Sequence, residues 1–262
     1  MFFKNIFTIY KREFKAYFYT PLAYVFIGMF IFFMGIMFLS FLMNYMQHTA
    51  GSMYQQGSQI TIDRFFEALY ANMHVILMIM IPFFTMRLFT SEASQGTFSL
   101  LMTSPIRTLE IVFAKFAGAG SIILIMLAMT VIFPIFLYAF SDKSAQSPGP
   151  DMGIVAATYL GLVLISFTYV AIGTFWSSVT ESQLIALVFT FFNIFFLWLL
   201  SLWAQSTQGT TQAILQQMAV NEQFQSFARG TLELKGFVIF LSYIVFYLFL
   251  TNRSIESRAW RS

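Results

Sequence analysis

Long apolar runs, each about as long as a membrane-spanning helix, dominate this sequence. About 20 apolar residues in helical conformation cross the hydrocarbon core of a bilayer. A spanning segment must also satisfy its own backbone hydrogen bonds, because lipid offers no partners, so each run is expected to be helical. The sequence therefore predicts an all-α polytopic membrane protein, a single transmembrane domain over residues 1–262. We place its six transmembrane helices at residues 22–43, 68–88, 116–140, 154–176, 183–203 and 236–251.

Charged residues are too few for a soluble protein. They make up 10% of the chain, against 58% for hydrophobic residues, whereas soluble domains carry roughly 25% charged residues. The chain has no cysteine, which excludes disulfides, thiolate metal sites and cysteine nucleophiles. No small-residue cleavage site follows a short apolar core near the N-terminus, so we expect no cleavable signal peptide.

Residues 1–19 combine aromatic and basic side chains in a pattern typical of an interfacial helix. The apolar side chains recur at spacings of three or four, which places them on one helix face. They are Phe2, Phe3, Ile6, Tyr10, Phe14 and Tyr17. We expect this helix to lie in the membrane interface with its basic side toward water. A plain positively charged segment before the first span is a compatible alternative.

The distribution of basic residues predicts the orientation in the membrane. An even number of spans places both termini on one side. With the termini inside, 10 of the 14 basic residues fall on the cytoplasmic side, and the reversed topology would invert this bias. Basic residues are enriched in cytoplasmic loops. Both termini and the segment 89–115 are therefore expected in the cytoplasm, and the polar loops at residues 44–65 and 204–235 outside.

The stretch from Pro82 to Lys115, which connects the second and third spans, gathers most of the interior charge. It contains Arg87, Glu92, Arg107, Glu110 and Lys115. Each of these would cost several kcal/mol at the centre of a bilayer, so we expect all of them in water at one membrane face.

Local signals divide this segment into a turn, a short helix and the start of a longer helix. Residues 91–96 are polar and predict a turn, and residues 97–103 predict one or two helical turns with an apolar side. Pro105 disfavours helical conformation at the residue before it and ends the short helix. A new helix then runs from residue 106 into the third span. The short amphipathic helix is suited to contact something outside the membrane; the alternative is that its apolar side rests on lipid.

Signatures of catalysis and energy conversion are missing from the sequence. It contains no G-x-x-x-x-G-K-[ST] phosphate loop, no H-E-x-x-H and no G-x-S-x-G motif. Its two histidines, His48 and His74, lie far apart and are expected at a polar interface, so we expect no catalytic residue, metal site or cofactor. The spans contain almost no ionisable residue, which argues against a proton-coupled transporter. Energy for any transport is therefore expected from another chain.

Three stretches of the chain resemble ABC-2 type permeases. Residues 85–115, TMRLFTSEASQGTFSLLMTSPIRTLEIVFAK, are similar to the cytoplasmic segment of that superfamily, and residues 177–186, SSVTESQLIA, to its turn between the fourth and fifth spans. Residues 221–260 resemble the C-terminal part of the gliding-motility-type and NosY-like branch, in which F-x-x-F-x-R-G precedes the last span. The residues that carry this last match are Phe224, Phe227, Arg229 and Gly230.

The resemblance implies the transmembrane permease subunit of an ATP-driven exporter in the bacterial cytoplasmic (inner) membrane. A separately encoded ABC ATPase subunit would bind the ATP, and a second permease chain would complete a homodimer or a heterodimer. The chain itself would be no enzyme, would contact membrane lipids and would bind no nucleic acid. The cytoplasmic coupling segment, residues 89–115, would dock in a cleft of the ATPase, which the N-terminal helix would also contact. The residues implied in ATPase coupling are Arg87, Glu92, Gly96, Thr97, Phe98, Leu100, Leu101, Pro105 and Arg107.

Two other functions are compatible with parts of the sequence. One is an ATPase-linked membrane scaffold with a mechanical or regulatory output, which would use the same coupling segment. The other is a membrane-embedded transferase, for example a lipid-modifying one. A transferase would need histidine, carboxylate or lysine side chains that converge at one membrane face, and the sequence shows no such cluster. An ATPase gene beside this one would favour the exporter or the scaffold over the transferase.

Overall fold

The computed structural model describes residues 2–51, 62–96, 107–140 and 150–259. Within these ranges the chain is largely helical and forms no strand. The helices, in chain order, are α1 (Phe2–Tyr19), α2 (Pro21–Gly51), α3 (Ile62–Thr85), α4 (Thr90–Ser94), α6 (Thr108–Thr130), α7 (Ile132–Phe140), α8 (Met152–Val179), α9 (Gln183–Ser206), α10 (Thr210–Met218), α11 (Val220–Ala228) and α12 (Leu234–Ala259).

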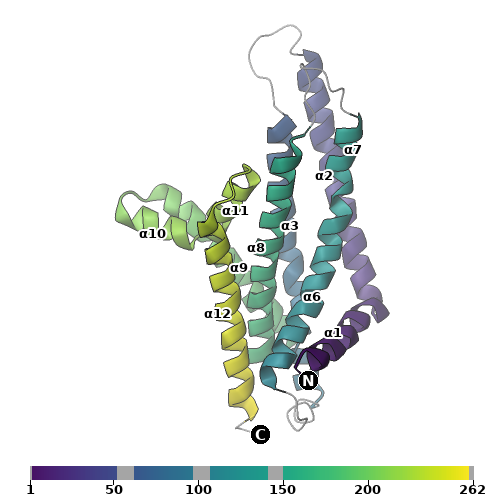
Figure 1. The fold of residues 1–262 in the computed structure, drawn as a ribbon, viewed down its shortest axis with the longest axis vertical. Coiled ribbons are helices and arrows are strands. Elements are labelled where there is room, and N and C mark those ends of the chain that lie inside the picture. Colours follow the sequence, from purple (N-terminus) through teal and green to yellow (C-terminus); the bar gives the residue numbers. More distant parts are fainter. Residues whose placement is uncertain (1, 52–61, 97–106, 141–149, 260–262) are drawn as a thin grey trace.

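Six helical segments within the described ranges are long and apolar enough to cross a membrane. They are Ala23–Asn44, Phe65–Ser94, Thr108–Phe140, Met152–Val179, Gln183–Ser206 and Leu234–Arg258. This finding confirms the predicted all-α membrane protein with six spanning helices. The spans stand side by side along the long axis of the molecule, and α1 and the C-terminal end of α12 lie at the same end (Figure 1). We call this the terminal end of the bundle.

Helix α8 is the central helix of the bundle, because α3, α6, α9, α11 and α12 all pack against it. Two of its glycines allow neighbouring side chains to approach its backbone. A Cβ at Gly173 would overlap the side chain of Thr85 at the end of α3, and a Cβ at Gly161 would stand 2.6 Å from the Cβ of Phe227 in α11. Small residues at such crossings let helices pack closely in a membrane.

A proline explains the break in the third span. Pro134 has no amide hydrogen, and in a continuous helix its ring would clash with the carbonyl of Thr130, four residues earlier. The helix therefore ends at Thr130 and starts again at Ile132, so α6 and α7 are separated by Val131. The amide of Val131 donates to the carbonyl of Ala128 at 3.3 Å, which is the tighter spacing of a 3₁₀ turn.

The polar turn expected at residues 91–96 is partly helical. Four turn residues follow α3, α4 then covers Thr90–Ser94, and the chain turns again at Gly96. The hydroxyl of Thr90 donates to the carbonyl of Met86, and that of Ser91 to the carbonyl of Arg87. Such bonds to the carbonyl four residues earlier are common for serine and threonine in helices. Gly96 has a φ of +67°, a left-handed conformation that favours glycine where a helix ends.

Two short helices follow α9 in the segment expected to be a polar loop. Helix α10 buries none of its residues. Helix α11 returns to the bundle and buries Val220, Phe224 and Phe227, and it packs against α8. Figure 1 shows α10 standing away from the spans and α11 between it and the bundle.

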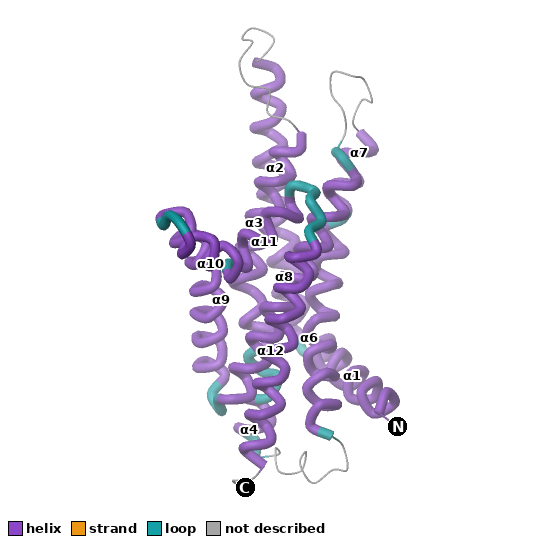
Figure 2. Tube along the Cα trace, turned by 60° about the vertical axis from the view of Figure 1, so that its left-hand side comes forward, coloured by secondary structure: helices purple, strands orange, loops and turns teal. Residues whose placement is uncertain are grey.

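Helix α1 crosses the terminal end of the bundle at an angle instead of running parallel to the spans (Figure 2). It packs along α6 and is connected to α2 by Thr20. Residues 2–19 are thus helical, and the inclination of the helix is compatible with the position in the membrane interface expected from its aromatic and basic faces.

Candidate functional site

A buried lysine lies where α1, α4 and α6 meet at the terminal end of the bundle. The side chain of Lys115 is only 2% exposed. Its ammonium group is 3.2 Å from Oε1 of Glu13 in α1 and 2.9 Å from Oε1 of Glu92 in α4. It also donates a hydrogen bond of 2.6 Å to the carbonyl of Leu88. Lys115 therefore joins three segments that are far apart in the sequence.

Arg12 completes this arrangement, which we call the charge cluster: Arg12, Glu13, Glu92 and Lys115. The guanidinium of Arg12 is 2.9 Å from Oε1 of Glu13 and 3.5 Å from Oε1 of Glu92. Two cations and two carboxylates make the cluster neutral as a whole. Arg12 is 60% exposed, whereas Lys115 is buried and depends on the carboxylates for compensation. The ring of Phe89, 5.2 Å from the ammonium, adds a cation–π attraction.

Two of the five charged residues expected in water are buried instead. Lys115 is 2% and Glu110 is 4% exposed. Both have partners, since Nδ2 of Asn5 donates to Oε2 of Glu110 at 3.0 Å. The expectation was wrong because it considered each charge alone. Helix α1 supplies partners from positions 105 and 102 residues earlier in the chain.

Small residues in α6 allow α1 to come this close. A Cβ at Gly118 would stand 3.1 Å from the Cβ of Glu13, which is tighter than ordinary van der Waals contact. Gly118 belongs to the run AGAG at residues 117–120, and such small residues favour close helix packing in membranes. At the next turn, the hydroxyls of Tyr10 and Ser121 share a hydrogen bond of 2.9 Å. This close crossing brings Glu13 within reach of Lys115.

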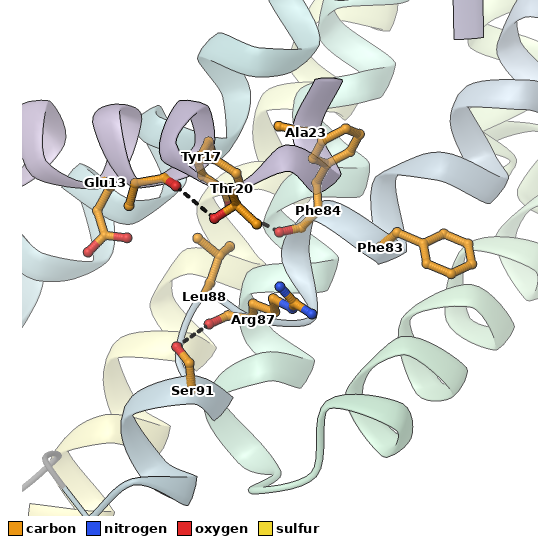
Figure 3. Close-up of a pocket in the computed structure, with 10 residues that line it drawn as sticks. Glu13, Tyr17, Thr20, Ala23, Phe83, Phe84, Arg87, Leu88 and Ser91 are labelled. Atoms are coloured by element: carbon orange, nitrogen blue, oxygen red, sulfur yellow. Dashed lines mark hydrogen bonds between the residues drawn. The ribbon is translucent and has the colours of Figure 1, made fainter. Parts of the chain in front are cut away.

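A cavity of about 210 Å³ lies beside the charge cluster (Figure 3). One wall consists of the C-terminal half of α1 and the first turn of α2, and the other of the end of α3 and the residues that lead into α4. Tyr17 connects the walls, since its hydroxyl donates to the carbonyl of Phe84 at 3.0 Å. Burial, and secondarily the Glu13 carboxylate, raises the pKa of the Tyr17 hydroxyl. Tyr17 therefore stays a neutral donor at physiological pH.

The structure describes four of the nine residues implied in ATPase coupling. Arg87 is exposed, and its Nε donates to Oε1 of Gln183 at the start of α9, 3.2 Å away. Glu92 belongs to the charge cluster, Gly96 forms the left-handed turn after α4, and Arg107 is exposed directly before α6. The five that lie outside the described residues are Thr97, Phe98, Leu100, Leu101 and Pro105.

Sequence reasoning missed two residues that hold this region together. Glu13 is the one acidic residue among the first 19, and that isolation among basic residues is a signal that it has a specific partner. Ser177, near the end of α8, accepts a hydrogen bond of 2.8 Å from the amide of Phe89 and donates one of 3.3 Å to the carbonyl of Met86. It lies in the stretch 177–186 that resembles the permeases, which marked the region without indicating this contact.

Among the described residues, no group of three or more His, Cys, Asp or Glu side chains is placed to hold a metal ion. His74 is 2% exposed and lies inside the bundle, not at a polar interface as expected. Its Nε2 is 2.6 Å from the hydroxyl of Tyr169, and its ring packs against Phe224. These contacts describe a hydrogen-bonded core histidine.

Comparison with known protein families gives one match over nearly the whole chain. The sequence model described as ABC-2 family transporter protein matches residues 7–261. The search of curated proteins found no match. The matched span includes the charge cluster, the coupling segment and the last span.

Proposed function

Since this chain belongs to the ABC-2 transporter family, we propose that it is the transmembrane permease subunit of an ATP-driven exporter. A separate ABC ATPase chain binds and hydrolyses the ATP, and this chain converts the resulting movement into a movement of its spans. The lack of a phosphate-binding loop in the sequence supports this division of labour.

The charge cluster is the observation that carries the proposal. It gives the coupling segment, residues 89–115, a fixed support on both sides of residues 97–106. Glu92 lies on the N-terminal side and Lys115 on the C-terminal side, and their charged groups are 2.9 Å apart. Glu13 connects the same lysine to α1. A partner that pushes on residues 97–106 therefore acts on α1, α4 and α6 together.

A movement of the coupling segment can then reach α8, the central helix, by two routes. In the first, the residues between α3 and α4 are hydrogen-bonded to Ser177 of α8. In the second, α6 packs directly along α8. Close-packed interiors have low compressibility and transmit strain, so a shift of the coupling segment reaches the helix that contacts most of the other spans.

We further propose that two permease chains, as a homodimer or a heterodimer, each engage one ATPase in the bacterial cytoplasmic (inner) membrane. Both termini and the coupling segment would face the cytoplasm. The excess of basic residues on that side, 10 of 14, supports this orientation. The common position of α1, α4 and the end of α12 at one end of the bundle agrees with it (Figures 1 and 2).

Membership of the gliding-motility-type and NosY-like branch is a proposal that rests on residues 221–260. The structure gives the F-x-x-F-x-R-G motif a role in packing. The side chain of Phe227 fills the space left by Gly161 and Gly236. Gly230 adopts a φ of +79° that allows the chain to turn from α11 toward α12. In this chain the motif packs α11 against α8 and α12, and the resemblance of residues 221–260 is what supports membership of that branch.

Charge substitutions in the coupling segment test the proposal. We expect Phe98→Asp and Leu101→Asp to lose the ATPase while the chain still inserts in the membrane. A charge that becomes buried in an ATPase cleft without a partner costs several kcal/mol, and about 1.4 kcal/mol already weakens binding tenfold. The measurement is the ratio of ATPase to permease after affinity purification from membranes.

Leu232→Asp is the matched control, because Leu232 is a 58% exposed apolar residue of the segment between α11 and α12. It should keep the ATPase at the wild-type ratio. Retention of the ATPase at that ratio by both Phe98→Asp and Leu101→Asp would refute the role of the coupling segment.

A further inference from the structure

The cavity beside the charge cluster has both apolar and polar lining residues. Ala23 and Phe83 are among the apolar ones, and Arg87 and Ser91 are among the polar ones. Ala23 is the first residue of the first candidate span, so the apolar part lies where the hydrocarbon region begins. Arg87 and Ser91 follow the end of α3 and lie near the end of the second candidate span, Phe65–Ser94. The cavity therefore lies near the terminal ends of the first two spans, close to the membrane boundary.

Arg87 brings a positive charge to this cavity that no described carboxylate neutralises. Within the described ranges its side chain has one hydrogen bond, from Nε to Gln183, and no ion pair. The acidic residue that lines the cavity, Glu13, pairs with Arg12 and Lys115 instead. Figure 3 shows the carboxylate of Glu13 and the guanidinium of Arg87 on different sides of the cavity.

The size and chemistry of the cavity fit one part of a lipid molecule. Sites for drug-sized ligands span about 300–1,000 Å³, whereas this cavity has about 210 Å³, which suits a headgroup. A guanidinium matches a phosphate in geometry and can bind it through two parallel hydrogen bonds. The apolar residues at the membrane side suit an acyl chain that continues into the bilayer. A free anion would use the arginine but would have no use for Ala23 and Phe83.

We propose that this cavity binds the phosphate headgroup of one membrane phospholipid, with Arg87 as the phosphate ligand and Phe83 along the acyl chain. The lipid sits between α1 and the end of α3, so it joins the interfacial helix to the second span. The proposal goes beyond the permease function and does not depend on it. It gives Arg87 a lipid partner in place of the ATPase.

Lipid titration of the purified full-length chain tests this assignment. The chain is stripped of lipid in detergent and titrated with dioleoylphosphatidylglycerol, and native mass spectrometry counts the lipid molecules retained per chain. We expect one tightly retained phosphatidylglycerol in the wild type. Arg87→Ala should weaken its retention about tenfold or more, as expected for the loss of a hydrogen-bonded charge. Arg87→Lys keeps the charge but loses the two parallel hydrogen bonds, so its retention should lie between those of the wild type and Arg87→Ala.

Two further variants separate the cavity from general surface charge. Ala16→Leu places a larger side chain into the cavity from an exposed position of α1, and it should displace the lipid although Arg87 is intact. Lys11→Ala removes a positive charge from an exposed position of the same helix outside the cavity, and it should leave the retained lipid unchanged.

Two other ligands and the ATPase complete the test. Dioleoylglycerol, which has the same chains without phosphate, should not be retained, and millimolar inorganic phosphate should not displace the phospholipid. Equal retention of dioleoylglycerol, displacement by inorganic phosphate, or wild-type lipid retention by Arg87→Ala would each overturn the proposal. Loss of the ATPase by Arg87→Ala without loss of lipid would assign the arginine to the ATPase instead.

Discussion

Replacing Lys115 with methionine tests the charge cluster most directly. Methionine is unbranched and of similar length, so it removes the ammonium group while it fills most of the same space. In the wild type, this group contacts Glu13, Glu92 and the carbonyl of Leu88. In the variant, Arg12 is the remaining cation of the cluster for both carboxylates.

The expected loss of stability follows from the burial of each group. Removing one partner of a buried ion pair costs about 3–5 kcal/mol. The lower end of this range applies, because Glu13 and Glu92 are 14% and 18% exposed and keep Arg12. The carbonyl of Leu88 also loses its donor, and an unsatisfied buried group costs about 1–3 kcal/mol. We therefore expect the free energy of unfolding to fall by about 3 kcal/mol.

Thermal unfolding of the purified chain in detergent, followed by circular dichroism, measures this loss. A fall of about 3 kcal/mol corresponds to a melting temperature lower by about 5–10 °C. Adding Glu92→Gln to Lys115→Met should recover part of the loss, since Arg12 and Glu13, 2.9 Å apart, then leave the cluster neutral. Arg12→Ala should lower the free energy of unfolding by at most about 1 kcal/mol, because the Arg12 side chain is 60% exposed. A Lys115→Met variant that melts at the wild-type temperature would refute the structural role of the cluster.

Three further changes test other features of the structure. Gly173→Ala should lower stability by about 1–3 kcal/mol through overpacking, because its Cβ would overlap Thr85, and adding Thr85→Gly should relieve part of this loss in the same melting assay. Tyr17→Phe should cost about 1 kcal/mol by removing one hydrogen bond. Because burial raises the pKa of Tyr17 in the folded chain, the wild type should lose stability as the pH rises above about 10, and the variant should lose less. The chain has no cysteine, so Gln95→Cys and Gln208→Cys can be probed on intact cells with an impermeant thiol reagent; we expect labelling at position 208 only, and labelling at position 95 alone would contradict the proposed orientation.

The elements of the fold were predictable because they depend on residues close in sequence. The lengths of the apolar runs indicated the number of spans. The spacing of aromatic residues indicated the helix at the N-terminus. The break in the third span follows from Pro134 alone. In each case the signal and its structural effect lie within a few residues of each other.

Contacts between distant segments were not predictable in this way. Lys115 resembled a solvated charge, because nothing near it in the sequence neutralises it and Glu13 lies 102 positions earlier. Phe224 and Phe227 recur at helical spacing within a polar stretch, but the spacing does not indicate that they pack against α8. The role of Phe98 and Leu101 in coupling stays a prediction. The contacts of the candidate site could therefore be found only from the tertiary structure, whereas the helices could be predicted from the sequence.

The order of the charge-cluster residues along the chain also affects how the protein is made. Arg12, Glu13 and Glu92 all precede Lys115, so the ribosome has produced every partner before the lysine emerges. Chains fold from the N-terminal side during synthesis, so both carboxylates are available when the third span enters the membrane. With the opposite order, the ammonium would become buried before any carboxylate was present to compensate it. In this sequence, the residue that most needs compensation is the last of its group to be synthesised.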